Sequence, residues 1–310
     1  MLGLAIGAAG LLTACGQGVA PSVAAGARTS GEFSGGIVPA GRTLLYISDE
    51  GNATVNEYTY PDLTLVAKLM DQGHPAGLCV DSDNAVWIVE SASLRIVKYA
   101  HGAKRPAKAL TDPNADNIYG CAVDPLSGDL AVADLGPPTG GGGVWVYTHA
   151  KGKPTEYRTV NLSAAYFCSY DASGNLFVDG IDKSGAFHLF RLGSSGSLQE
   201  IAFNQSVGFP GGMAWDGAHL AVGDQYYEKK HVSAIYRLAI SGSTATLAGT
   251  TRLGGTCDVA QFAIGSGDVI APDVCQNDAG LYHYPRARGG PLNDIGGLAY
   301  PLSAAISLPK

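Results

Sequence analysis

The sequence repeats one pattern from residue 43 onward. In each copy an apolar strand ends in Asp or Gly, a short turn follows, and a second apolar strand ends in an acidic residue or Gly before a third strand with an aromatic residue. The second strands end at positions 90, 134, 180, 224 and 273, so the spacings are 44, 46, 44 and 49 residues. Periods of this length are typical of propellers and solenoids. The copies are Gly77–Asp81 with Val86–Glu90, Cys121–Asp124 with Leu130–Asp134, Cys168–Asp171 with Leu176–Gly180, Met213–Asp216 with Leu220–Asp224, and Phe262–Gly265 with Val269–Asp273.

The repeated segments have the composition of strands. Val, Ile, Tyr, Phe and Thr cluster in short runs without the spacing of an amphipathic helix. Runs such as 86–89 are apolar on both faces, whereas a strand of a two-layer sandwich has one polar face. Sheets stacked face to face around an axis bury both faces without helices, which is the architecture of a β-propeller.

The ends of the chain set the number of blades. Leu45–Asp49 matches the second strand of a blade but has no inner strand before it, and 302–308 is a strand with no partner after it. If the C-terminal strand completes the first blade, the ring closes without an exposed strand edge. We therefore predict an all-β, six-bladed β-propeller over residues 43–310, with the C-terminal strand closing the first blade.

The phrase P-x-G-x-x-x-D followed by x-L-x-V-x-D, clearest at His74–Asp81, resembles the NHL-repeat and SMP-30-like propellers over roughly residues 43–308. Those families include binding scaffolds, calcium-dependent lactonases, lyases and peptide-processing enzymes. The resemblance therefore implies a fold and leaves the activity open.

The N-terminus carries an export signal. Residues 2–12 are apolar but too few to span about 30 Å of hydrocarbon, and they fit the core of a secretory signal. The following Leu12-Thr13-Ala14-Cys15 resembles the lipobox of bacterial lipoproteins, although no Lys or Arg precedes the apolar run. We predict a signal peptide over 1–15, lipid attachment at Cys15 and a flexible Gly/Ala/Ser-rich tether over 16–42. An ordinary secretory signal with a chance cysteine is the alternative.

Acidic residues recur where second strands end, on the face shared by the loops that lead into the inner strands. The positions are Asp49, Glu90, Asp134, Asp224 and Asp273. One interpretation is a collar for a cation or polar ligand; the other is that each carboxylate accepts backbone N–H groups in its own turn. Repetition in five blades favours the second interpretation.

Other side chains with useful chemistry are expected on the same face. His74, and His231 with Asp224 and Glu228 nearby, offer a general base or a metal ligand, with a solvated loop as the alternative. Tyr119 and Tyr166 begin inner strands, where they either line a shallow pocket for an apolar or sugar-like ligand or plug the channel. The candidate ligand face comprises His74, Asn117, Tyr119, Asp134, Tyr166, Asp224, Glu228, His231, Asp258 and Asp273.

The resemblance to calcium-dependent lactonases implies oxygen ligands near the starts of inner strands. Only Asp258 and Asn117 offer such ligands here, because the corresponding positions are Ala76, Tyr119, Phe167, Gly212 and Ser303. We predict no cofactor, with calcium as the alternative.

The cysteines outside the signal fall into two groups. Cys257 and Cys275 lie at one end of the sixth blade, and we predict a disulfide between them in an exported protein. Cys121 and Cys168 occupy equivalent places in adjacent blades, too far apart for bridging. We predict that Cys79, Cys121 and Cys168 are buried free thiols.

The expected function is binding. A net charge of −7 excludes the basic surface that nucleic-acid binding requires. We expect an exported, lipid-anchored module at the bacterial cell envelope, on its periplasmic or outer surface, whose partner is an envelope protein, a glycan or a small molecule. The alternative is a lactonase- or lyase-like enzyme that uses the same face.

Overall fold

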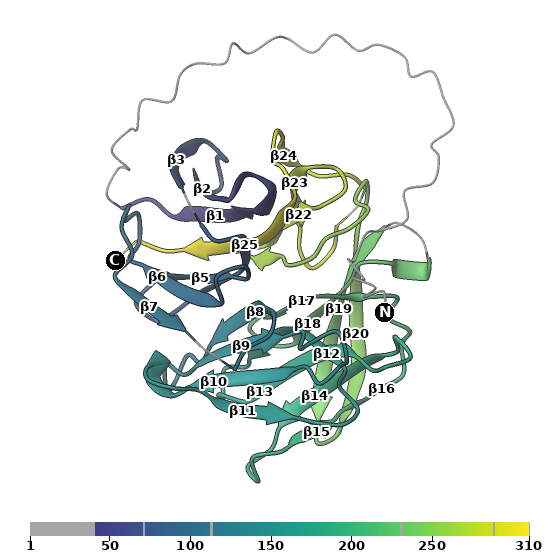
Figure 1. Cartoon of the computed structure of the whole chain (residues 1–310). Helices are drawn as coiled ribbons and strands as arrows, with labels where there is room; N and C mark the ends of the chain where they lie inside the picture. The colour runs from purple at the N-terminus through teal and green to yellow at the C-terminus, as the bar shows by residue number, and fades with distance from the viewer. Residues whose placement is uncertain (1–40, 71, 112–113, 230–231, 288, 310) are drawn as a thin grey trace, which may run out of the picture. The chain divides into compact units, whose positions relative to one another are not determined.

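The computed structural model describes residues 41–70, 72–111, 114–229, 232–287 and 289–309. These residues form six sheets arranged as the blades of a β-propeller (Figure 1), which confirms the predicted fold. The signal peptide, Cys15 and nearly all of the predicted tether lie outside the described residues, as does His231.

The blades follow one another along the chain. Blade 1 contains β25 (Pro301–Ser307), β1 (Leu44–Asp49), β2 (Thr54–Thr59) and β3 (Leu65–Leu69). Blade 2 contains β4 (Pro75–Val80), β5 (Val86–Glu90), β6 (Arg95–Tyr99) and β7 (Lys108–Thr111). Blade 3 contains β8 (Ile118–Val123), β9 (Leu130–Asp134), β10 (Gly143–Tyr147) and β11 (Thr155–Arg158). Blade 4 contains β12 (Ala164–Tyr170), β13 (Leu176–Ile181), β14 (Phe187–Leu192) and β15 (Leu198–Glu200).

Blades 5 and 6 depart slightly from this arrangement. Blade 5 contains β17 (Pro210–Trp215), β18 (Leu220–Asp224), β19 (Ser233–Ser241) and β20 (Thr244–Leu253), with the short β16 (Ala202–Phe203) added in parallel at its outer edge. Blade 6 contains β21 (Ala263–Ile264), β22 (Asp268–Asp273), β23 (Asp278–His283) and β24 (Asn293–Ile295). Three single-turn 3-10 helices are η1 (Glu50–Asn52), η2 (Thr148–Ala150) and η3 (Tyr227–Lys229).

The C-terminal strand closes the ring as predicted. β25 pairs antiparallel with β1, with Tyr46 opposite Ala305 and Ile47 opposite Ala304. Because β1 hydrogen-bonds β25 on one side and β2 on the other, neither edge of β1 is left open.

The core lies between neighbouring blades, which explains strands that are apolar on both faces. Trp87 from blade 2 and Trp145 from blade 3 belong to one cluster and are each 1 % exposed. Side chains of this size contribute about 2–3 kcal/mol each when they are fully buried.

The packing between blades 2 and 3 also includes a pair of cysteines, and here the sequence prediction was wrong. Cys79 and Cys121 form a disulfide between the two blades, with their Cα atoms 5.7 Å apart. The positions of Cys79 and Cys121 within the repeat differ by one residue. Because successive side chains of a strand point to opposite faces, Cys79 faces blade 3 and Cys121 faces blade 2. Cys168 occupies the same position of the repeat as Cys121 and faces blade 3. It remains a buried free thiol, as predicted.

The predicted Cys257–Cys275 disulfide is also present, with Cα atoms 6.2 Å apart. Two disulfides are typical of proteins in an oxidising compartment reached by export. Within the described part of the chain, no helix has the length and apolar character needed to cross a membrane.

Candidate ligand-binding site

We call the side of the propeller that carries the loops into the inner strands the front face, and the opposite side the back face. Inner strands start at the front face, so Tyr119 in β8 and Tyr166 in β12 lie near its centre. The geometry of this face depends first on the acidic residues that end the second strands.

The Asp134 carboxylate at the end of β9 holds the loop that leads into its own blade. It accepts the backbone N–H groups of Asp116 at 3.0 Å and Asn117 at 2.8 Å, and also that of Gly136 at 2.8 Å. Asp134 is fully buried. Its carboxylate oxygens are therefore engaged by the backbone rather than presented to a ligand.

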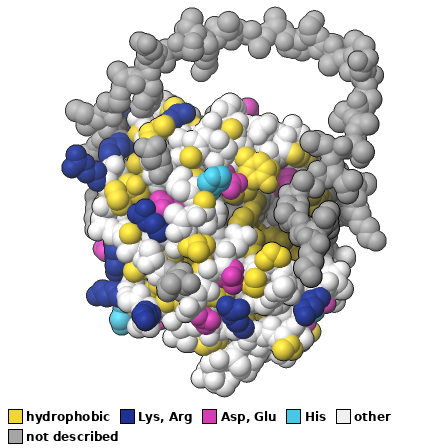
Figure 2. All heavy atoms as spheres, in the orientation of Figure 1, with side chains coloured by type: hydrophobic (Ala, Val, Ile, Leu, Met, Phe, Trp, Pro, Cys, Tyr) yellow, Lys and Arg dark blue, Asp and Glu magenta, His cyan; other side chains and the backbone are white. Residues whose placement is uncertain are grey.

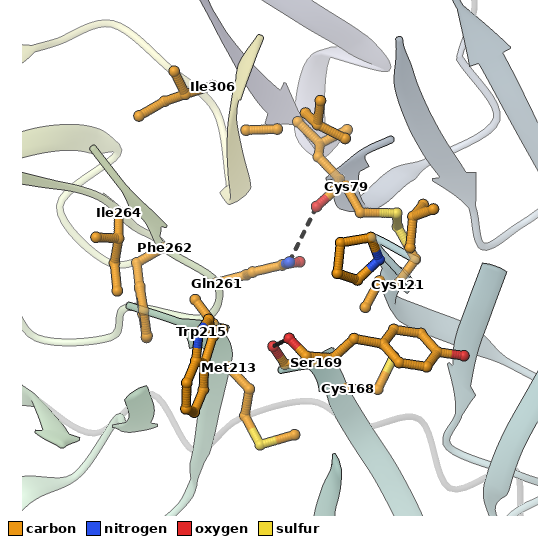
Figure 3. Close-up of a pocket in the computed structure, with 18 of the residues that line it drawn as sticks. Cys79, Cys121, Cys168, Ser169, Met213, Trp215, Gln261, Phe262, Ile264 and Ile306 are labelled. Atoms are coloured by element: carbon orange, nitrogen blue, oxygen red, sulfur yellow. Dashed lines mark hydrogen bonds between the residues drawn. A yellow bond between two sulfur atoms is a disulfide. The ribbon is translucent and has the colours of Figure 1, made fainter. Parts of the chain in front are cut away.

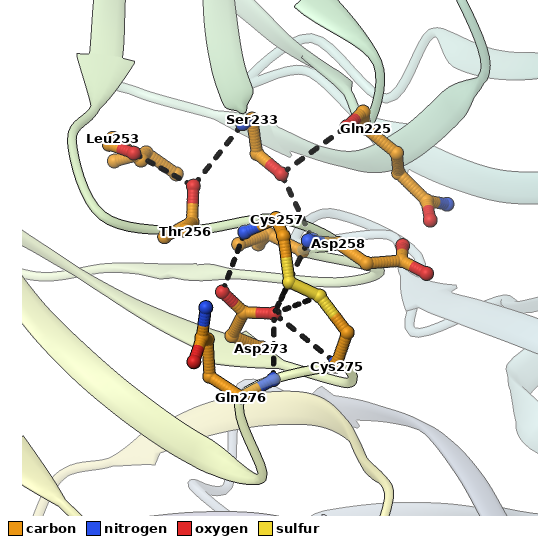
Figure 4. The surroundings of a disulfide bond; sticks show 10 residues. Gln225, Ser233, Leu253, Thr256, Cys257, Asp258, Asp273, Cys275 and Gln276 are labelled. Atoms are coloured by element: carbon orange, nitrogen blue, oxygen red, sulfur yellow. Dashed lines mark hydrogen bonds between the residues drawn. A yellow bond between two sulfur atoms is a disulfide. The ribbon is translucent and has the colours of Figure 1, made fainter. Parts of the chain in front are cut away.

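Blades 1, 5 and 6 use the same arrangement. Asp49 accepts the N–H of Ala299 at 2.7 Å, and Asp224 accepts those of Gly208 at 2.9 Å and Tyr226 at 3.0 Å. In Figure 4, Asp273 bonds the backbone on both sides of the disulfide, at Cys257 N, Asp258 N, Cys275 N and Gln276 N. These contacts support the interpretation that the carboxylates accept backbone N–H groups. The donors come from the loop before the inner strand as well as from the acid's own turn.

Blades 2 and 4 differ from this arrangement. Glu90 bonds the Ser93 hydroxyl in its own turn at 2.8 Å. In blade 4 the equivalent position is Gly180, where an added Cβ would collide with the Ala164 carbonyl oxygen. The acid there is Asp179, one residue earlier, fully buried, with one oxygen bonded to Phe167 N at 2.9 Å and the other without a partner among the described residues.

Four aromatic rings form a continuous arc at the centre of the front face, which we call the aromatic arc: Tyr119, Tyr166, Phe209 and Tyr226. Ring centroids are 6.0 Å apart for Tyr119 and Tyr166, 5.1 Å for Tyr166 and Phe209, and 5.9 Å for Phe209 and Tyr226. The first two contacts are edge to face, at 83° and 74°. Contacts of this kind hold rings in fixed relative orientations.

Local backbone features position the arc. A Cβ at Gly120 would lie 2.7 Å from the Tyr166 carbonyl oxygen, so the close approach of β8 to β12 requires glycine here. Asp224 holds the other end, because it accepts the N–H groups of both Phe209, at 3.3 Å, and Tyr226, at 3.0 Å. A buried carboxylate thus fixes the backbone from which two rings of the arc project.

The tyrosines of the arc are neutral. Burial raises the pKa of Tyr119, and nearby acidic groups, including Glu50 and Asp258, raise it further. Burial and Asp179 raise the pKa of Tyr166, while burial and Asp258 raise that of Tyr226. A neutral phenol can both donate and accept a hydrogen bond.

Polar side chains complete the centre of the face from blades 1, 2 and 6. His74 Nδ1 lies 3.4 Å from a carboxylate oxygen of Glu50. Burial raises the pKa of Tyr300, which is 50 % exposed, and Glu50 and Asp258 raise it further. The side chain of Asp258 points away from Asp273 in Figure 4. Figure 2 shows one face of the molecule, where hydrophobic side chains gather near the middle with a histidine and acidic side chains beside them.

The structure thus brings together four of the predicted residues, His74, Tyr119, Tyr166 and Asp258. Asn117 is exposed and Glu228 is an exposed partner of Arg252, at 2.8 Å, beyond Tyr226 in the loop after β18. Sequence reasoning missed Phe209, Tyr226, Tyr300 and Glu50. Their one shared signal was position, since each lies within two residues of an inner-strand start or a second-strand end.

Among the described residues of this face, no cluster of acidic side chains marks a calcium site. Within the described ranges, the one group of His, Cys, Asp and Glu ligand atoms close enough to share an ion is Cys257, Asp273 and Cys275. Its sulfurs are bonded to each other and its carboxylate accepts backbone N–H groups, whereas calcium takes oxygen ligands. We therefore derive no chemistry through a metal.

Comparison with known proteins shows the fold. No family model and no curated protein matches the chain. A chain in the crystal structure of a nidogen/laminin complex is 14 % identical with a TM-score of 0.69, covering 86 % of this chain and 99 % of that one. A protein of unknown function from Bacteroides caccae is 12 % identical with a TM-score of 0.63, covering 86 % and 99 %. Streptogramin B lyase is 14 % identical with a TM-score of 0.52, covering 82 % and 73 %. At these identities the likeness extends to the fold alone.

Proposed function

We propose that this protein is an exported, lipid-anchored binding module of the bacterial cell envelope, and that its front face binds an uncharged, sugar-like ligand. The observation that carries the proposal is the aromatic arc. A sugar ring has an apolar C–H face and a rim of hydroxyl groups. The arc offers ring faces and edges for the first, and the neutral phenols with Glu50, His74 and Asp258 offer partners for the second.

One observation supports binding over catalysis. Asp49, Asp134, Asp224 and Asp273 are buried and bonded to backbone N–H groups. Export is supported by the two disulfides, and the anchor by the lipobox-like Leu12–Cys15.

A glycan array tests the proposal. The chain should bind a restricted set of neutral glycans, and Tyr166→Ala should abolish that binding. Tyr157→Ala is the matched control, because Tyr157 is a partly buried tyrosine on the outer strand β11, away from the arc. Binding that survives Tyr166→Ala would contradict the assignment of the arc. Loss of labelled fatty-acid incorporation in Cys15→Ser would separately test the anchor.

The contact between His74 and Glu50 favours a second candidate function. In this alternative the protein is a lyase- or lactonase-like enzyme with His74 as the general base. Streptogramin B lyase, which shares the fold, suggests streptogramin B as a substrate to test, together with simple lactones. Turnover of either that His74→Ala abolishes would establish this candidate in place of a plain binding module.

A further inference from the structure

A cavity lies on the propeller axis at the back face, on the side opposite the aromatic arc. Its volume is about 520 Å³ and residues of all six inner strands line it (Figure 3). Each blade contributes one large apolar side chain at or near the end of its inner strand, and all six are half-buried. The six are Val80, Val123, Tyr170, Trp215, Ile264 and Ile306.

Gln261 lines this cavity and makes hydrogen bonds to two neighbouring blades. Its side-chain nitrogen donates to the Leu78 carbonyl at 3.1 Å, and its side-chain oxygen accepts from the Ser303 hydroxyl at 2.9 Å. Ser303 in turn accepts the N–H of Leu78 at 2.9 Å. The Gln261 amide therefore ties blades 6, 1 and 2 together.

The lining of the cavity combines apolar side chains with hydrogen-bonding groups. Leu78, Met213 and Phe262 line its walls, and among the described residues no Lys, Arg or His lines it. The charged group at its edge is Asp171, whose carboxylate already accepts the N–H groups of Ser173 and Asn175. The Gln261 amide has a second N–H beyond the one used on Leu78.

We infer that this cavity binds a small, uncharged, mainly apolar molecule that carries a hydrogen-bond acceptor such as a ketone or ester carbonyl. Its volume falls in the range of small-molecule sites, about 300–1,000 Å³. The described lining offers no cation to pair with an anion, and the Gln261 amide offers an N–H donor to an acceptor on the ligand.

The test uses prodan, a neutral naphthalene ketone whose emission shifts to the blue in an apolar site. The protein is the full chain with Cys15→Ser, which removes the predicted lipid attachment. One molecule should bind per chain with a blue-shifted emission. Val123→Glu places a charge in the apolar wall and should weaken binding by more than about tenfold. The control Val160→Glu makes the same change at a side chain that is 94 % exposed and should leave binding unchanged.

Two further variants keep the test decisive. If Val123→Glu fails to fold, Ala122→Phe fills the cavity with apolar volume and should abolish binding. Trp215→Ala removes one of the six apolar side chains that line the cavity and should weaken prodan binding about fivefold. Absence of a saturable, one-to-one blue shift, or binding indifferent to Val123→Glu and Ala122→Phe, would overturn the inference. A blue shift that depends on self-association in light scattering would overturn it in favour of a dimer interface.

The back cavity is independent of the proposed front-face function. Tyr166→Ala should leave prodan binding intact, and Ala122→Phe should leave glycan binding intact. Loss of ligand binding at one site therefore has no bearing on the proposal for the other.

Discussion

The ring of Tyr166 meets the ring of Phe209 edge to face, with centroids 5.1 Å apart, across the boundary between blade 4 and the loop into blade 5. This contact joins two pairs of rings into one arc. Asp224 anchors the Phe209 end, so a residue that touches no ligand sets the shape of the proposed site.

Asp224→Ala should therefore affect both stability and binding. The substitution leaves the N–H groups of Gly208, Phe209 and Tyr226 without their acceptor, and we expect the free energy of unfolding to fall by about 2–4 kcal/mol. The remaining folded protein should bind glycan more weakly. Denaturant titration measures the first effect, with the exposed Asp62→Ala as control. Equal stability of the two variants would refute the role given to Asp224.

Asp179 should make stability depend on pH. Burial raises the pKa of its carboxyl well above the ordinary value, so the folded chain retains this proton to a higher pH than the unfolded chain. The contribution of Asp179 to stability is fully present at a pH below the pKa that its carboxyl has in the unfolded chain. The contribution is lost as the pH rises through the pKa that the carboxyl has in the folded chain.

Asp179→Asn removes that titration with little change of shape. The variant should gain more than about 1 kcal/mol over the natural protein as pH rises from about 4 to about 8. Urea titrations across this range measure the difference, with exposed Asp62→Asn as control. A difference that stays constant with pH would contradict the prediction.

The two disulfides should contribute unequally. Cys79–Cys121 spans 42 residues and Cys257–Cys275 spans 18, so chain-entropy arguments give about 4 kcal/mol for the first and about 3 kcal/mol for the second. Paired Cys→Ser variants in denaturant titrations should follow that order. Non-reducing peptide mapping should find both pairs and a free Cys168. A peptide linking Cys121 to Cys168 would show that the assignment is wrong.

Removal of the closing strand should open the ring. Deletion of 301–310 exposes the edge of β1 to solvent and to other chains, so we expect loss of cooperative unfolding and aggregation. Deletion of 308–310, beyond the strand, is the matched control. A soluble, cooperatively folding 1–300 chain would be inconsistent with the closure described above.

The repeat in the sequence is enough to predict the blades and their closure, because strand period and turn residues are local properties. The Cys79–Cys121 bond escapes prediction because it depends on which face each cysteine takes, and a one-residue offset reverses that face. The repeat assigns each acid to its own turn, yet Asp134 also bonds a loop 17 and 18 residues away, which no local pattern reveals.

The aromatic arc is predictable only in part. Tyr119 and Tyr166 follow from their places at the starts of inner strands. Phe209 and Tyr226 join them through the Asp224 contacts and the packing of one blade on the next, which are tertiary effects. The repeat indicates which loops share the front face, but not which of their side chains contact one another.

Calorimetric titration of a neutral glycan selected on the array tests the central claim most directly. We predict a single site on the natural protein, a loss of more than about tenfold in affinity for Tyr166→Ala, and no change for Tyr157→Ala. Equal affinity of Tyr166→Ala and the natural protein would contradict the role proposed for the front face.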